Sequence, residues 1–414
     1  MEAGLLAFFA AFAACAVFVG ATRFHRVGLD HTDSGPQKVH ALSVPRIGGL
    51  AVLAGILLGA LWLRTGPHAS LILLLVLVAA PAFFGGLYED LTKRFPAGAR
   101  LVTAFCAAAA GFFLLDARIT DLDLWGTDWL LGFAAVSFAF TVFAVGGFSH
   151  ALNIVDGFNG LSAIAALMKL AALATVATAV SDSTIAQACV LIGASILGFL
   201  LWNYPRGTIF LGDGGAYLLG FLIAELAVLL VHRNSQVSPW FALLLLFYPV
   251  WETLFSSYRR RVLRGRSPGD ADGLHLHTLV YRRLVRWKIG SRDVRHRRWR
   301  NALTTPYLIV LSSITVLPAA LFWDNTLVLE FFALAFALVY VTLYWRIVRL
   351  KAPRLLVLRR PLESRDRRVR LGTDGAYALV TASDPSQNAR ESGSGVPEEE
   401  SAEANSSLSR SGHD

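Results

Sequence analysis

The chain has 414 residues, of which 55% are hydrophobic and 16% are charged, and its mean hydropathy is +0.53. This composition lies well outside the range of soluble globular domains, so a protein that folds entirely in water is excluded. The net charge of +9 comes mainly from basic clusters beside apolar runs, where such clusters normally face anionic lipid headgroups. We therefore expect contact with membrane lipids and no nucleic-acid partner.

Apolar runs of about 20 residues recur along the chain, and each is long enough to cross ~30 Å of hydrocarbon as a helix. In chain order they cover residues 4–22, 47–65, 70–88, 98–115, 129–148, 161–180, 184–203, 214–232, 239–257, 303–323 and 325–345. Beyond residue 349 the sequence turns basic and then rich in Ser, Glu and Gly, with too few apolar residues to fold. The sequence predicts an all-α integral membrane protein, with a polytopic bundle of about 10–11 transmembrane helices in residues 1–348 and a largely disordered tail in residues 349–414.

The loops between these runs alternate between the two sides of the membrane, and basic residues are divided unequally between the sides. One set of loops contains Arg23, Arg26, Lys38, Arg46, Lys93, Arg94, Arg100, Arg206 and fourteen Lys or Arg residues between 259 and 300, whereas the other contains Arg64, Arg118 and Arg233. The positive-inside rule places the more basic set in the cytoplasm. We therefore expect the N-terminus outside and the C-terminal tail in the cytoplasm.

Five polar stretches interrupt the apolar sequence, and all five fall on the predicted cytoplasmic side. They contain Lys38 and His40, then Glu89 and Asp90, then Asn153, Asp156 and Asn159, then Asn203 and Asp213, and finally His275 and His277. Any one of them could be an ordinary turn or helix end. Ionisable groups at a membrane boundary are costly, however, and usually mark function. Together, the five stretches predict an active site at the cytoplasmic face.

The residue types in these stretches suit phosphate chemistry. Carboxylate oxygens, here those of Asp90, Asp156 and Asp213, are the ligands that Mg²⁺ prefers, and Mn²⁺ can replace it. The neighbouring glycines allow backbone N–H groups to approach phosphate oxygens closely. The competing interpretation is a secondary transporter, which would place its polar groups near mid-membrane in broken helices and often in repeated halves. This sequence shows no repeated halves, and its polar groups gather at one surface.

The motifs resemble those of the polyprenyl-phosphate N-acetylhexosamine-1-phosphate transferases, glycosyltransferase family 4. Over about residues 1–345 the chain contains KVHALSVPRIGGL, GLYEDLTKR, NIVDGFNGL, FLGDGGAYLLG and HLH, in that order. The resemblance implies transfer of N-acetylhexosamine 1-phosphate from a UDP-sugar to undecaprenyl phosphate, with release of UMP. Such a reaction initiates a cell-surface glycan, such as lipopolysaccharide or a cell-wall polymer, at the bacterial inner membrane. The oligomeric state stays open, a homodimer included.

The resemblance also implies roles for individual residues. Asp213 would be the main Mg²⁺ ligand, and Asp156 a second metal ligand or a residue that orders phosphate. Asp90, supported by Glu89, would accept a residual proton from the prenyl phosphate or act as the nucleophile of a two-step route, and the sequence leaves both open. The substrate-binding residues would be Lys38, His40, Asn153, Asn159, Asn203, His275 and His277. Lys169, inside the sixth run, either contacts the lipid phosphate or extends to the surface.

Several positions depart from the family pattern. Glu89 and Asn159 stand where aspartates are common, and Thr278 stands where a further histidine is usual. The missing histidine argues against a peptide-bearing donor and favours UDP-GlcNAc, UDP-GalNAc or a related sugar, with discrimination in the loop around His275. These departures also keep open a catalytically inactive homologue that binds only the lipid-linked sugar.

Overall fold

The structure, a computed structural model, describes residues 1–21, 29–30, 44–63, 67–263, 265, 274–285 and 294–349. All of them belong to one compact unit, residues 1–359. Lys38 and His40 lie outside the described residues, as does the predicted tail apart from its first residue. The division into a membrane domain and a disordered tail therefore stays a prediction.

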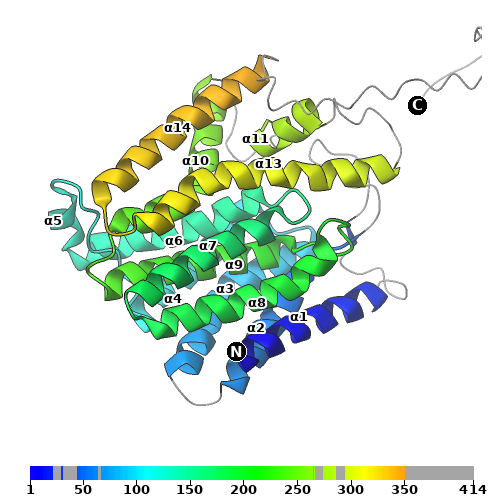
Figure 1. Cartoon of the computed structure of the whole chain (residues 1–414), viewed down its shortest axis with the longest axis horizontal. Coiled ribbons are helices and arrows are strands. Elements are labelled where there is room, and N and C mark those ends of the chain that lie inside the picture. Colours follow the sequence, from blue (N-terminus) through cyan, green and yellow to red (C-terminus); the bar gives the residue numbers. More distant parts are fainter. Residues whose placement is uncertain are drawn as a thin grey trace, which may run out of the picture. The chain divides into compact units, whose positions relative to one another are not determined.

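Ten of the described helices are long and apolar enough to cross a membrane (Figure 1). They are α1 (Glu2–Ala21), α3 (Pro67–Thr92), α4 (Ala97–Leu114), α6 (Ala134–Val155), α7 (Leu161–Ala179), α8 (Ser183–Asn203), α9 (Gly212–Arg233), α10 (Pro239–Tyr258), α13 (Val294–Leu321) and α14 (Thr326–Val348). The second of the eleven predicted runs forms a shorter apolar helix, α2 (Gly48–Trp62). The predicted all-α, multi-pass membrane protein is confirmed.

The remaining elements are short. They are the helices α5 (Thr127–Leu131) and α11 (Leu276–Leu279), the π-helical turns η1 (Arg259–Leu263) and η2 (Val280–Val285), and the two-residue strands β1 (Leu29–Asp30) and β2 (Val44–Pro45). The two strands pair in antiparallel register. β2 leads directly to α2, and Phe210 donates from its backbone N–H to the carbonyl of Pro45 at 2.8 Å. The start of α2 is thereby tied to the segment that precedes α9.

Two helix boundaries differ from the sequence prediction in a way that matters for function. The third run was expected to end at residue 88, but α3 continues to Thr92, so Glu89 and Asp90 lie in its last turn rather than in a loop. The fifth was expected at 129–148, but α6 covers Ala134–Val155, and Asp156 is its C-cap. Apolar composition does not detect these turns, because polar residues at a membrane boundary still make helical hydrogen bonds.

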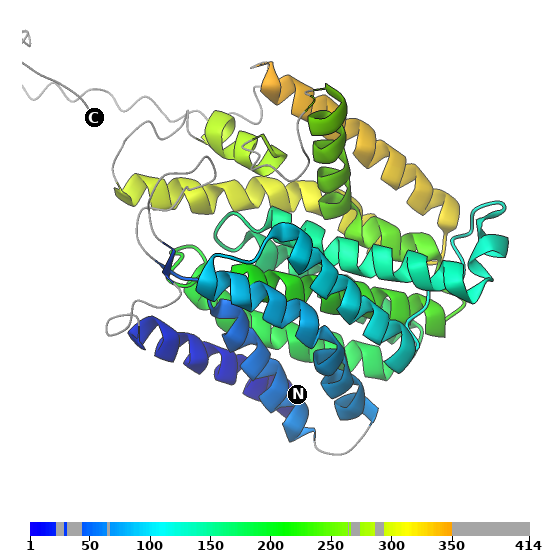
Figure 2. The ribbon, with the colours of Figure 1, turned by 180° about the vertical axis from the view of Figure 1, so that it is seen from behind.

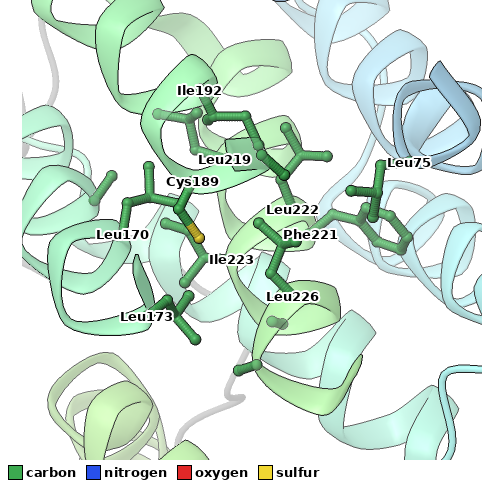
Figure 3. Close-up of a cluster of buried hydrophobic side chains, with 14 of the residues drawn as sticks. Leu75, Leu170, Leu173, Cys189, Ile192, Leu219, Phe221, Leu222, Ile223 and Leu226 are labelled. Carbon is green, nitrogen blue, oxygen red and sulfur yellow. The ribbon is translucent and has the colours of Figure 1, made fainter. Parts of the chain in front are cut away.

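Helix α9 lies at the centre of the main core. Every residue from Gly212 to Leu230 is buried, and Figure 3 shows leucines and isoleucines of α7, α8 and α9 packed together, with Leu75 of α3 nearby. Glycines bring two further helices against the beginning of α9. A methyl group on Gly49 would lie 2.4 Å from the Cα of Gly215, and one on Gly86 would lie 2.5 Å from the N of Gly214. Small residues thus let α2 and α3 approach the backbone of α9 closely.

A second core is formed by α10, α11, η2, α13 and α14. Its buried residues include Tyr248 of α10, Leu276 of α11 and Tyr340 of α14, and it extends to Val155 and Phe158 at the turn between α6 and α7. Figures 1 and 2 show α14 and α10 side by side, with α9 lying between them and the layer made of α1 and α2. The turn after α6 therefore joins the two cores.

All five motifs have described residues, the first of them only from residue 44 on, and these meet at one end of the bundle, which we call the motif end. It comprises residues 44–49, 89–100, 153–161, 203–214 and 274–285. Backbone N–H groups of Gly48 and Gly49 donate to the carbonyls of Phe210 and Leu211 at 2.9 and 2.8 Å. The side chain of Asn203 accepts from the N–H of Gly160 at 2.6 Å. Alternation of the helices brings these distant segments together.

Candidate active site

Asp213, in the first turn of α9, lies between two arginines. Its Oδ1 accepts a hydrogen bond of 2.7 Å from Arg46, and its Oδ2 forms an ion pair with Arg100 of α4. The residue is only 8% exposed, and a buried carboxylate without such partners would be strongly destabilising. Charge-assisted hydrogen bonds from guanidinium groups stabilise the carboxylate and fix its orientation.

Asp90, in the last turn of α3, is 1% exposed and faces the same arginine. Its Oδ2 accepts from the backbone N–H of Gly214 at 2.9 Å, and its Oδ1 lies 3.4 Å from the Nε of Arg46. The N–H belongs to the first turn of α9, where the helix dipole favours negative charge. Gly212 has a φ of +78°, and a methyl group there would lie 2.6 Å from Asp90 Oδ2. The glycine of the FLGD motif is therefore required by both backbone conformation and space.

Asp156 completes a group of three carboxyls near Arg46. It caps α6 and is half-buried. Burial raises the pKa of Asp156 to about 6, although Ser162 and Arg46 act in the opposite direction. Arg46 is thus close enough to act electrostatically on Asp156 while it contacts Asp90 and Asp213. The predicted convergence of these three aspartates at one face is what the structure shows.

The two histidines lie on the other side of the turn that follows Asp156. Their rings stack in parallel, with centroids 5.2 Å apart, and His277 also packs edge-on against Phe158 at 5.8 Å. A methyl group on Gly157 would lie 3.7 Å from Nε2 of His277. Nδ1 of His275 lies 3.0 Å from Oε1 of Glu252 in α10. The histidine motif is therefore placed against the NIVDG turn.

The two predicted asparagines are buried and hydrogen-bonded to the backbone. Asn203 accepts from Gly160 and donates to the carbonyl of Ile209 at 2.8 Å. Asn159 donates to the carbonyl of Pro205 at 3.1 Å, and its own N–H donates to Asn301 at 2.7 Å. These contacts hold the turns of the motif end together, while Oδ1 of Asn159 has no protein partner among the described residues. Substrate binding by either asparagine stays a prediction.

Three further predicted residues occupy separate positions. Glu89 accepts from the backbone N–H of Phe95 at 2.7 Å, so its carboxylate holds the loop after α3. Asn153 is half-buried in the last turn of α6. Lys169 is fully buried in α7 and donates to the carbonyl of Ala165 at 3.4 Å, so its ammonium group does not reach the surface.

Three residues of this region were missed as site candidates by reasoning from the sequence. Arg46 and Arg100 were counted only as evidence of orientation, and Glu252 was passed over inside an apolar run. A signal for Glu252 existed, because a carboxylate in the middle of FYPVWETLF is an intramembrane charge. Arg100, inside the fourth predicted run, carried the same signal.

A divalent cation at this site would need oxygen ligands from the aspartates. Among the described residues, no three His, Cys, Asp or Glu side chains are arranged as a metal site. Asp213 and Asp156 have the donor type that Mg²⁺ takes, which is usually one or two carboxylates together with phosphate and water. Binding at Asp213 requires that a guanidinium group leaves one of its oxygens, since both oxygens now contact arginine.

The fold is that of a multi-pass membrane protein, and comparison with known proteins supports an enzyme that transfers phosphosugars. The model of glycosyl transferase family 4 matches residues 71–231. An undecaprenyl-phosphate alpha-N-acetylglucosaminyl 1-phosphate transferase of Thermotoga maritima is 29% identical over 66% of this chain and 78% of the relative. A phospho-N-acetylmuramoyl-pentapeptide-transferase of Lacticaseibacillus paracasei is 26% identical over 57% of this chain and 75% of the relative. The resemblance to glycosyl transferase family 4 that the motifs predicted is confirmed over residues 71–231.

A third relative, from Bacillus subtilis, is named as a probable undecaprenyl-phosphate N-acetylglucosaminyl 1-phosphate transferase. It is 26% identical over 58% of this chain and 66% of its own length. The matched family segment, residues 71–231, contains the three aspartates and Arg100 but not Arg46, Glu252 or the histidines. The histidine loop is thus outside the part of the chain that the family model covers.

Proposed function

We propose that this protein transfers N-acetylhexosamine 1-phosphate from a UDP-sugar to undecaprenyl phosphate, releases UMP, and so initiates a cell-surface glycan. The observation that carries the proposal is the convergence of Asp90, Asp156 and Asp213 around Arg46 at one end of a membrane bundle. The match to the family model and the names of the relatives support the reaction class.

The main obstacle to this reaction is electrostatic. The prenyl phosphate has a second pKa of ~6 and is largely dianionic at neutral pH, so it repels the diphosphate that it must attack. Arg46 and Arg100 provide planar guanidinium groups that bind phosphate oxygens well. In our proposal these arginines exchange their carboxylate contacts for phosphate contacts when substrates bind. Positioning and charge stabilisation then account for most of the catalysis.

A magnesium ion would be held by Asp213 and Asp156, with Mn²⁺ as a substitute. Mg²⁺ neutralises charge on the phosphates and orients them when bound. The residues of the chain keep the surroundings in place: Gly214 and Arg46 orient Asp90, and Arg100 orients Asp213. In our proposal, Lys38 and His40, which precede β2 in the sequence, also bind the phosphates. Asn153 and Asn159 bind the nucleotide or the sugar.

We favour direct attack over a covalent enzyme intermediate. An oxygen of the prenyl phosphate forms a bond with the β-phosphorus, the bond from that phosphorus to the UMP oxygen breaks, and UMP leaves with the electron pair. Asp90 is almost completely buried, and its two oxygens face Gly214 and Arg46. Such a carboxylate suits an orienting role or acceptance of a residual proton better than nucleophilic attack.

The donor in our proposal is UDP-GlcNAc, UDP-GalNAc or a related N-acetylhexosamine. Thr278 is buried beside His277, where the family usually has another histidine. The uridine and the two phosphates are common to all candidate donors, so discrimination belongs to groups that face the sugar. We place the motif end on the cytoplasmic side of a bacterial inner membrane. The loops assigned to this side contain most of the basic residues, and nucleotide sugars are cytosolic.

The test is release of UMP by the purified protein. UDP-GlcNAc should yield UMP only when undecaprenyl phosphate is present, and EDTA should stop the reaction until Mg²⁺ or Mn²⁺ is restored. A transporter would release no UMP, and an inactive homologue would bind the substrates without releasing it. Either result contradicts the proposal. A panel of UDP-sugars identifies the donor, and preference for UDP-MurNAc-pentapeptide would contradict only our interpretation of the histidine loop.

A further inference from the structure

A buried carboxylate of α10 lies beside the histidine motif, outside the aspartate cluster. Glu252 is 1% exposed. Its Oε1 lies 3.0 Å from Nδ1 of His275 and accepts from the backbone N–H of Leu276 at 3.1 Å, and its Oε2 accepts from the hydroxyl of Tyr340 at 2.6 Å. One carboxylate therefore connects α10, α14 and the segment that begins α11.

Glu252 lies next to aromatic residues of the second core. Tyr248 lies one turn earlier on α10, and Tyr340 and Tyr344 lie one turn apart on α14, all within the second core. A charge buried in such a place is strongly unfavourable unless hydrogen bonds compensate for its lost hydration. An apolar residue would fill the same space with less cost, so the carboxylate indicates a functional requirement.

The hydrogen bond at Nδ1 determines how His275 can act. Because a carboxylate accepts and does not donate when ionised, Nδ1 of His275 must carry the proton, which leaves Nε2 as the atom available to other groups. Leu276, held by the same oxygen, fixes the backbone between the two histidines. His277 stacks on His275, and its Nε2 faces the Gly157 turn. The carboxylate of Glu252 thus orients the His275 ring directly and the His277 ring through stacking.

We propose that Glu252 is a positioning residue: it orients His275, and through the stacked rings it holds His277 beside Gly157 and Phe158, where the two histidines bind the phosphosugar portion of the donor. The inference rests on the proposed function. Glu252 itself does not touch substrate, because it is buried behind the histidines in the second core. Tyr340 supports the far oxygen of the carboxylate.

Substitutions at Glu252 separate its charge from its shape. Glu252→Gln keeps one oxygen for His275 and Leu276, and its amide can donate to the hydroxyl of Tyr340, so the geometry is retained while the charge is lost. Glu252→Ala removes both. We expect kcat/KM for the nucleotide sugar to fall about tenfold in the glutamine variant and about 100-fold in the alanine variant, the range for losing a group that orients a functional histidine. Tyr340→Phe should cost less than either.

The matched control is Glu225→Gln. Glu225 is a fully buried carboxyl of α9 with no hydrogen-bond partner for either oxygen among the described residues. The Glu225→Gln variant tests whether loss of any buried carboxyl in the bundle impairs activity. We expect its kcat/KM to equal the wild-type value. If neither Glu252→Gln nor Glu252→Ala is less active than Glu225→Gln, Glu252 has no positioning role.

A double-mutant cycle distinguishes positioning from a general effect on the fold. If Glu252 acts through His275, the pair Glu252→Gln and His275→Ala should be no less active than His275→Ala alone, whereas independent effects would multiply. Multiplication of the two losses overturns the proposal. Glutamine is used here because the alanine variant could fail to fold, and equal thermal stability of the single variants in detergent confirms intact protein.

Nitrogen-15 NMR of His275 provides a readout that needs no turnover. The resonance, assigned by its loss in His275→Ala, should show Nδ1 protonated in the wild type. In Glu252→Ala the neutral ring should shift toward the Nε2-protonated tautomer. A neutral wild-type ring that is protonated only at Nε2 overturns the inference. If the wild type releases no UMP from any UDP-sugar, the proposed function fails, while the NMR result still decides the role of Glu252.

Discussion

Both ends of the helix bundle contain several carboxylates, but they use them differently. At the motif end, Asp90 and Asp213 are buried, and they contact groups 124 and 167 positions away in the sequence. At the opposite end, the side chain of Asp116 is 63% exposed; it pairs with Arg118, two positions along the chain, and lies 3.8 Å from Nε2 of His232. Exposed pairs of this kind contribute little to stability. The difference shows that burial of the paired carboxylates, rather than the number of charges, distinguishes the site.

The opposite end also contains hydrogen bonds between distant segments, and these have a structural character. Asp123 accepts from Thr326 at 2.6 Å in an exposed position, and Trp240 donates to the carbonyl of Leu122 at 3.1 Å. Trp125 and Trp129 are largely exposed beside them, as expected for aromatic residues at a membrane interface. Exposed contacts thus hold the loops there, whereas at the motif end guanidinium groups contact buried carboxylates.

The largest contrast between the two ends should come from neutralising one carboxylate at each. Asp213→Asn removes a proposed metal ligand and the partner of two arginines, so we expect kcat/KM to fall about 10³-fold, comparable to loss of a main charge-stabilising group. Asp116→Asn should leave activity unchanged. Both variants are compared by UMP release after purification, with thermal stability as the control for folding. Near-normal turnover of Asp213→Asn would contradict the assignment.

The second comparison removes an arginine from each end. Arg100→Ala leaves Asp213 with Arg46 as a partner and removes one of the proposed phosphate donors, so we expect a loss of about 10- to 100-fold in kcat/KM. Arg118→Ala, the matched variant at the opposite end, removes only an exposed ion pair. Equal activity of the two variants would show that Arg100 has a structural role alone.

A third experiment tests which end faces the cytoplasm. Arg94→Cys and Asp121→Cys place exposed cysteines at the motif end and at the opposite end, in a background whose native cysteines are replaced by serine. An impermeant thiol reagent added to intact cells should label position 121 at once, and position 94 only after permeabilisation. The reverse pattern would overturn the proposed orientation and, with it, a cytosolic nucleotide sugar as donor.

The smallest effect is expected from the tail. Deleting residues beyond Ser386 removes a polar, glutamate-rich stretch that cannot bury a core, so turnover should stay within about twofold of the wild type. The full-length protein, purified in the same detergent, is the reference. A large loss would show that the tail contributes to the motif end.

The sequence by itself determined the class of the protein and predicted that its candidate site residues lie on one face. Apolar runs partition into a bilayer through local composition, so ten long helices and α2 follow from the pattern alone. The order of the motifs and their predicted side indicated the family. They also led to the hypothesis that Asp90, Asp156 and Asp213 belong to one site. Each of these conclusions depends on residues that are near one another in the chain.

Only the tertiary structure decided which partners these groups have. Arg46 pairs with Asp213, 167 positions away, because α2 and α3 approach the start of α9 through facing glycines. Glu252 reaches His275 because α10 and α14 build a core under the histidine loop. Such pairings depend on how helices pack, and helix packing depends on side-chain shape across segments far apart in sequence. The composition of the chain and the spacing of its motifs do not reveal how these side chains fit together.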